Sequence, residues 1–295
     1  MKIGIAGIGK MGSAIATRLG GLGHEVHVWN RTAEKARALA AAGAKVAATP
    51  RELATSAEVI ISILTNADAL ESTYSRSEGL LAGEVAGKLF IEMSTVRPYT
   101  EQALAAKVAA KGAVMIECPV GGTVGPAREG KLFGFAGGDA KDVARAKPLL
   151  DQLCRRVEHV GPVGAGASMK LAINLPLLVY WQALGEALVL CQPLGLDPAR
   201  VIDIFSDTSG GPNVLKVRGP AIAAALKGQD TGAITFDIDS IRKDLQTMIE
   251  EANSLGGTLP VTVRALECFD EASREGLGKG DATLLPVRWT KQARP

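Results

Sequence analysis

The chain has 295 residues, and its 33 Lys and Arg stand against 31 Asp and Glu, which leaves a formal charge of +2. This length predicts about two domains, and 47% apolar with 22% charged residues is typical of a globular protein, which excludes a disordered or collagen-like chain. The balanced charge gives no support for a nucleic-acid surface, whereas 34 glycines, about 12% against a usual value of about 7%, call for an explanation.

The first half of the chain alternates short apolar runs with helical patterns. We expect strands at residues 2–6, 25–29, 59–63, 89–92, 115–118 and 133–136. Helical patterns lie between most of these runs, among them residues 11–22, 32–42 and 100–111. Such alternation predicts a parallel sheet that is covered by helices on both faces.

The second half of the chain shows helical periodicity and no convincing strand. Helices are expected at residues 199–206, 214–226, 241–255 and 259–275. Polar residues interrupt the apolar stretch 171–196, which favours buried helix over a membrane span, with a long helix near 163–192 joining the domains. The change of class near residues 161–166 predicts an α/β domain at 1–162 and an all-α domain at 163–295.

A glycine-rich sequence follows the first predicted strand and opens a helix. It runs Gly7-Ile8-Gly9-Lys10-Met11-Gly12. In this G-x-G-x-x-G pattern Gly7 permits a tight turn, Gly9 lets the backbone approach a pyrophosphate, and Gly12 lets helix and strand pack closely. The helix N-terminus would offer free N–H groups to the phosphates. The six residues therefore predict a Rossmann dinucleotide-binding domain; a glycine turn without a ligand is the alternative.

The end of the second predicted strand indicates which dinucleotide binds. An NAD site usually has Asp or Glu there, whereas this chain has Asn30, Arg31 and Thr32. Guanidinium and hydroxyl groups bind a 2′-phosphate that a carboxylate would repel. We therefore predict NADP(H) over NAD(H). The alternative is a solvated Arg31 at a helix start, with Thr32 serving only as the helix N-cap.

The cysteines and histidines predict no further prosthetic group. The four cysteines are far apart and form no C-x-x-C pair, and the three histidines show no metal-ligand spacing, so we expect no metal site. The same spacing offers no disulfide framework, and the N-terminus shows no signal-peptide pattern. We expect a protein of the reducing cytoplasm.

The glycine-rich loop is the first of four motifs that occur in the order typical of the β-hydroxyacid dehydrogenase family. The chain resembles this family over essentially its whole length. The second motif is Pro119-Val120-Gly121-Gly122-Thr123. The third is the glycine-rich segment 161–166 followed by Lys170 and Asn174, and the fourth is Lys243-Asp244-Leu245. Together these motifs are far more specific than any one of them.

The resemblance implies roles for individual residues. Lys170 matches the catalytic lysine, which would donate a proton to the substrate oxygen, and Asn174, one helical turn later, matches the asparagine that holds substrate. Lys243 matches a lysine that reaches the cofactor. The cofactor would also contact two segments that follow strands, Leu64-Thr65-Asn66 and Met93-Ser94-Thr95.

The second motif departs from the family pattern at the substrate. The family sequence Pro-Val-Ser-Gly-Gly has a carboxylate-binding serine where this chain has Gly121, and a glycine where it has Thr123. Gly121 and Gly122 can still offer backbone N–H groups to an anion. The substrate is therefore left open. Pro176, inside the expected long helix, predicts a kink or a restart of that helix.

These observations predict an NADPH-dependent oxidoreductase that transfers hydride between the nicotinamide and a small aldehyde, ketone or β-hydroxyacid. An imine reductase and a non-catalytic NADP-binding protein are the alternatives, and Lys170 argues against both. The resemblance and the apolar long helix also predict a homodimer or homotetramer. No nucleic-acid or membrane partner is expected.

Overall fold

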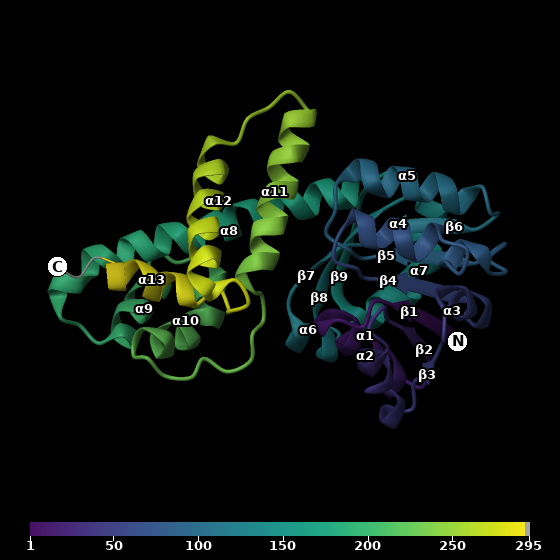
Figure 1. The fold of residues 1–295 in the computed structure, drawn as a ribbon, viewed down its shortest axis with the longest axis horizontal. Helices are drawn as coiled ribbons and strands as arrows, with labels where there is room; N and C mark the ends of the chain where they lie inside the picture. The colour runs from purple at the N-terminus through teal and green to yellow at the C-terminus, as the bar shows by residue number, and fades with distance from the viewer. Residues whose placement is uncertain (293–295) are drawn as a thin grey trace. The chain divides into compact units, whose positions relative to one another are not determined.

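The computed structural model describes residues 1–292 and divides into two compact units, Met1–Leu171 and Ala172–Pro295 (Figure 1). The division falls within a long helix, whereas the sequence predicted a boundary between residues 162 and 163; the end of the predicted second domain, 293–295, lies outside the described residues.

A nine-stranded sheet forms the middle of the first unit, in the strand order β3-β2-β1-β4-β5-β6-β8-β7, with β9 paired to β8. Its strands are β1 (Lys2–Ala6), β2 (Glu25–Trp29), β3 (Lys45–Val46), β4 (Val59–Ser62), β5 (Leu89–Glu92), β6 (Val114–Glu117), β7 (Val120–Gly121), β8 (Leu132–Gly137) and β9 (Cys154–Gly161). Neighbouring strands from β3 to β6 are parallel, but β8 is antiparallel to β6 and to β7. The predicted parallel sheet therefore extends from β3 to β6, and β8 adds antiparallel pairings that the sequence did not predict.

Helices cover both faces of this sheet, as the strand–helix alternation predicted. They are α1 (Lys10–Gly21), α2 (Ala33–Arg37), α3 (Pro50–Ser56), α4 (Ala67–Ser75), α5 (Pro98–Ala109), α6 (Val124–Glu129) and α7 (Ala140–Leu153). Side chains alternate between the faces: Ile3 and Ile5 of β1 pack with the core of α1 and α7, whereas Ile60 and Phe90 pack with α3, α4 and α5.

The helix predicted at residues 32–42 is shorter than expected. α2 ends at Arg37, and a 3₁₀ turn at Ala40–Ala42 stops at Gly43, whose φ is 88°. Only Ala36 of α2 is buried, so little packing sustains a longer helix.

The second unit is helical, which confirms the predicted fold class of a Rossmann domain followed by an all-α domain. Its helices are α8 (Ala165–Cys191), which begins in the first unit, α9 (Pro198–Ser206), α10 (Asn213–Leu226), α11 (Ile238–Ser254), α12 (Pro260–Ala272) and α13 (Leu284–Gln292). α12 ends three residues earlier than predicted, at a π turn that contains Gly276 with φ 90°, and α13 was not predicted.

The sequence predicted a kink or a restart at Pro176; α8 runs through it as one helix of 27 residues, so the helix does not restart there. A proline removes one hydrogen bond of the helix. On the next turns Leu178, Trp181 and Leu184 are buried, and this packing stabilises the helix around the missing bond. The segment Ala165–Leu194 is long and apolar enough to cross a membrane, but core helices of globular proteins can have the same length and composition.

Candidate active site

The glycine-rich loop after β1 leaves one position open. A Cβ atom at Gly7, whose φ is 103°, would overlap the carbonyl oxygen of Ile63, and one at Gly12 would overlap the carbonyl oxygen of Gly7. A Cβ atom at Gly9 would meet no heavy atom within 4 Å, and Gly9 is exposed. The protein's own packing thus explains Gly7 and Gly12, whereas the open backbone at Gly9 fits the close approach of a pyrophosphate. The neighbouring Ile8 is buried and Lys10 is exposed.

The residues that follow β2 hold this loop and present polar groups beside it. The N–H of Ile8 donates to Oδ1 of Asn30 at 2.9 Å, and Nδ2 of Asn30 donates to the carbonyl oxygen of Thr32 at 2.9 Å. Arg31 and Thr32 are exposed. Thr32 stands at the N-cap of α2, but its side chain makes no capping hydrogen bond. The structure therefore gives no support for Thr32 as a mere helix cap.

The two predicted cofactor segments after β4 and β5 are joined to each other. The N–H of Leu64 donates to Oγ of Ser94 at 2.8 Å, and the N–H of Ser94 donates to Oε2 of Glu92 at 2.8 Å. Thr65 and Asn66 are exposed, and Oδ1 of Asn66 caps α4 by accepting from the N–H of Ala69 at 2.9 Å. Thr95 follows Ser94 and is half-buried.

Three buried glutamates lie near the carboxyl ends of β5 and β6, and none of them was predicted from the sequence. Glu92 and Glu117 end the neighbouring strands β5 and β6 in register, and Glu101 lies on α5; all three are 0% exposed. The Glu101 carboxyl group accepts no hydrogen bond from a donor group of the described residues, and it lies within hydrogen-bond reach of the Glu92 carboxyl group. For Glu92 and Glu117 the sequence does contain a signal, because each ends an otherwise apolar strand.

Burial raises the pKa of all three carboxyl groups, because a charge loses its hydration there. The pKa of Glu117 rises to about 7, although three backbone N–H groups oppose the shift. For Glu101 the charge of Glu92 adds to the effect of burial and raises the pKa well above its ordinary value.

The second motif lies on β7 and the start of α6. Gly121 pairs with Phe133, and a Cβ atom at Gly121 would make ordinary contacts, with Phe133 and Phe135 at 3.8 Å. Gly122 has φ 123°, and its Cβ atom would lie 2.8 Å from Cδ2 of Leu132. Space would therefore permit a serine at position 121, whereas position 122 needs glycine. Thr123 is exposed.

α8 carries both residues that were predicted to contact substrate. Lys170 is half-buried and Asn174 is 7% exposed, and their i, i+4 spacing places them on one helix face. α8 begins at the carboxyl end of β6, where Glu117 accepts hydrogen bonds from the N–H groups of Gly166 and Ala167 at 3.0 and 3.1 Å. β1, β4, β5 and β6 are successive parallel strands, so their carboxyl ends lie at the same end of the sheet. The glycine-rich loop follows β1 and therefore opens at the end of the sheet where α8 begins.

The fourth motif lies in the second unit. Lys243 is on α11, and its Nζ lies 2.5 Å from Oδ1 of Asp244, whose side chain is 5% exposed. The role of Lys243 toward the cofactor stays a prediction.

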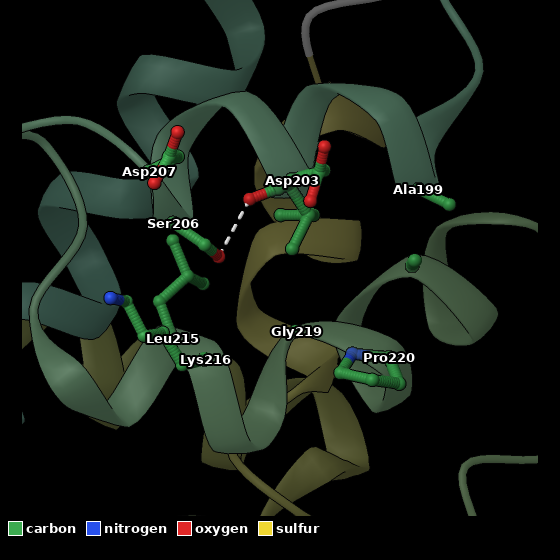
Figure 2. Close-up of a pocket in the computed structure, with 10 residues that line it drawn as sticks. Ala199, Asp203, Ser206, Asp207, Leu215, Lys216, Gly219 and Pro220 are labelled. Atoms are coloured by element: carbon green, nitrogen blue, oxygen red, sulfur yellow. Dashed lines mark hydrogen bonds between the residues drawn. The ribbon is translucent and has the colours of Figure 1, made fainter.

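Two further features lie outside the predicted site. In the part of the chain that the structure describes, no group of three or more His, Cys, Asp or Glu side chains could hold a metal ion. A cavity of about 480 Å³ lies between α9 and α10 of the second unit, with Asp203, Ser206 and Asp207 on one wall and Lys216 and Pro220 on the other (Figure 2). No predicted site residue lines this cavity.

The sheet, the glycine-rich loop and the open backbone at Gly9 define a dinucleotide-binding protein with a helical second unit. Family models agree with both parts. Residues 2–161 match the NAD binding domain of 6-phosphogluconate dehydrogenase, and residues 164–287 match the NAD-binding domain of NADP-dependent 3-hydroxyisobutyrate dehydrogenase.

Individual relatives match the chain over nearly its full length. It is 34% identical to 3-hydroxyisobutyrate dehydrogenase of Pseudomonas aeruginosa, over 93% of this chain and 95% of the relative. It is also 34% identical to 3-sulfolactaldehyde reductase of Escherichia coli, over 97% and 95%. The solved structure of Mycobacterium tuberculosis 3-hydroxyisobutyrate dehydrogenase with L-serine superposes with a TM-score of 0.84 at 26% identity, covering 97% of this chain and 98% of that one.

The chain belongs to the β-hydroxyacid dehydrogenase family, as the four motifs predicted. It is an NAD(P)-dependent oxidoreductase that acts on CH–OH groups.

Proposed function

We propose that this enzyme uses NADPH and interconverts a small aldehyde or ketone with the corresponding alcohol, as a semialdehyde reductase or 3-hydroxyacid dehydrogenase. The observation that carries the proposal is the start of the Lys170 helix at the sheet edge where the glycine-rich loop opens. Ligands of open parallel sheets bind outside the carboxyl ends of the strands, which is this edge.

The cofactor, when bound, supplies or accepts the hydride. The contribution of the chain is to stabilise the oxygen on which negative charge develops. The ammonium group of Lys170 donates a hydrogen bond to that oxygen and then transfers a proton to it, and in the reverse direction the neutral amine takes the proton. The amide of Asn174, one turn along α8, cannot supply a proton, and its role is to orient the substrate.

The polar groups after β2 support NADP(H) as the cofactor. Arg31 and Thr32 are exposed beside the glycine-rich loop, where Asn30 is hydrogen-bonded to Ile8. A guanidinium and a hydroxyl group at this place suit a 2′-phosphate, and none of the three residues directly after β2 is an Asp or Glu that would repel it.

The proposed substrate is small and carries an acidic group. The two curated relatives are named for 3-hydroxyisobutyrate and 3-sulfolactaldehyde, which are small compounds of this kind. Gly121 and Gly122 would bind the acidic group through backbone N–H donors, with Thr123 as a hydroxyl donor two residues after Gly121. The preferred acid differs from that of relatives with a serine at position 121, because this hydroxyl is missing.

The test follows NADPH absorbance with a panel of semialdehydes, glyoxylate, sulfonated aldehydes and cyclic imines. We expect turnover of an acidic aldehyde, and at least a hundredfold loss of kcat in Lys170→Ala with unchanged NADPH affinity. Lys141→Ala, which removes an exposed lysine of α7, is the matched control. Activity of Lys170→Ala within tenfold of the wild type would contradict the proton-donor role.

The same panel separates the alternatives. Turnover of cyclic imines alone would identify an imine reductase. Tight NADPH binding without turnover of any compound would identify a non-catalytic NADP-binding protein.

We also propose that the enzyme works in the cytoplasm as a homodimer or homotetramer. Only 39% of the most apolar stretch of the Ala165–Leu194 segment is buried, and Leu190 and Leu194 are exposed. Apolar area left in water favours association with a second copy. Light scattering should give a mass of two or four chains, and the mass of one chain would contradict the proposal.

A further inference from the structure

One buried carboxylate holds the first turn of α8. Both oxygens of Glu117 accept hydrogen bonds, Oε1 from the N–H groups of Gly164 and Gly166 and Oε2 from the N–H of Ala167. The first N–H groups of a helix have no partner within the helix, and a negative charge at this end is favoured by the helix dipole. A single side chain at the end of β6 therefore ties a helix of 27 residues to the sheet.

Three glycines leave the space that this arrangement needs. A Cβ atom at Gly137 would overlap Oε1 of Glu117, and one at Gly166 would overlap the carbonyl oxygen of Phe135. Gly164 has φ 103°, and its Cβ atom would lie 2.8 Å from Nε2 of Gln102. Close approach of the helix to the strands thus explains Gly137 and Gly166, whereas the positive φ and the contact with Gln102 of α5 explain Gly164.

Lys170 lies directly above this attachment on α8. It follows Gly166 by four residues and Ala167 by three, so all three share one side of the helix. Rotation of the first turn about the helix axis, or sliding along it, would carry the ammonium group away from the substrate oxygen. Proton transfer requires heavy-atom distances of about 2.6–3.2 Å, and a displacement of about 1 Å can reduce a rate by about a hundredfold.

We propose that Glu117 is a positioning residue that sets the place of Lys170 by holding the N–H groups of Gly164, Gly166 and Ala167. This inference rests on the proposed role of Lys170 as proton donor. A purely stabilising role explains the glutamate less well, because its charge is buried beside Glu92 of β5 and Glu101 of α5 and is therefore costly to form. A neutral amide offers only one acceptor oxygen, whereas the three N–H groups use both oxygens of Glu117.

The test compares Glu117→Gln with Glu84→Gln, which removes an exposed carboxylate of the same unit. The glutamine keeps the length of the side chain but loses the charge and one acceptor oxygen. We expect kcat to fall at least tenfold in Glu117→Gln, with the KM and Kd for NADPH within twofold of the wild type. The control should keep the wild-type kcat. An unchanged kcat in Glu117→Gln, or an equal loss of NADPH affinity, would overturn the proposal.

Amide hydrogen exchange provides a readout that does not depend on turnover. Exchange at residues 164–167 should be at least tenfold faster in Glu117→Gln, while the amides of β1 and α1 exchange as in the wild type. Unchanged exchange at 164–167 would overturn the attachment itself. If the wild type turns over no carbonyl compound, the proposed function fails, and the exchange rates alone decide whether Glu117 holds α8.

Discussion

Replacing Glu117 with Gln should flatten the pH dependence of the folding free energy. The pKa of this carboxyl group is raised from 4.5 to about 7 in the folded protein, because burial removes its hydration. Below pH 4.5 the group is protonated in both states. Between pH 4.5 and 7 the unfolded chain releases the proton while the folded chain keeps it, so stability falls as pH rises; above pH 7 the contribution is constant.

The magnitude follows from the shift. A difference of about 2.5 pKa units corresponds to at most about 3.4 kcal/mol at about 1.36 kcal/mol per unit. Between pH 5 and pH 8 the same two pKa values give a loss of about 2.5 kcal/mol from this one group. Glu92 and Glu101 shift in the same direction and add to the wild-type dependence, so only the difference between wild type and Glu117→Gln isolates Glu117.

The assay is urea unfolding at constant ionic strength, followed by circular dichroism at several pH values between 5 and 8. The wild type should lose roughly 2 to 3 kcal/mol more than Glu117→Gln over this interval, and Glu84→Gln should follow the wild type. Parallel pH profiles for wild type and Glu117→Gln, within about 0.5 kcal/mol, would refute the assignment of a raised pKa to this buried group.

Three further outcomes are expected. Arg31→Ala should raise the KM for NADPH by about tenfold to a hundredfold while leaving that for NADH nearly unchanged, because a charge-assisted hydrogen bond contributes about 1.5–3 kcal/mol; equal changes for both cofactors would argue against a 2′-phosphate contact. Gly122→Ala should lower the free energy of unfolding by about 1–3 kcal/mol, because φ is 123° and Leu132 is close, whereas Gly121→Ala should change it by less than about 0.5 kcal/mol; similar midpoints for the two variants in urea would contradict this. Glu101→Gln should stabilise the protein, relative to the wild type, more at pH 8 than at pH 5, because it removes a buried group whose pKa is raised. A pH profile of the unfolding free energy parallel to that of the wild type would exclude this explanation.

Local sequence patterns were enough for much of the first unit. β1, β2 and β5 begin and end where the apolar runs predicted. The strand–loop–helix around Gly7, Gly9 and Gly12 was equally predictable, since its backbone requirements are met within one short segment. The very short strands β3 and β7 were missed because pairing with a neighbour, rather than their own composition, makes them strands.

Other features depended on contacts between distant segments. The sequence by itself determined the cofactor loop, the class of the two units and the presence of Lys170 four residues before Asn174. Only the tertiary structure decided that Asn30 ties the loop to β2, that α8 passes through Pro176, and that Glu117 meets the N-terminus of the Lys170 helix. A glutamate in a sequence is expected to be charged and solvated; the register of β5 with β6 and the packing of α5 and α8 bury Glu117, and burial is what changes its chemistry.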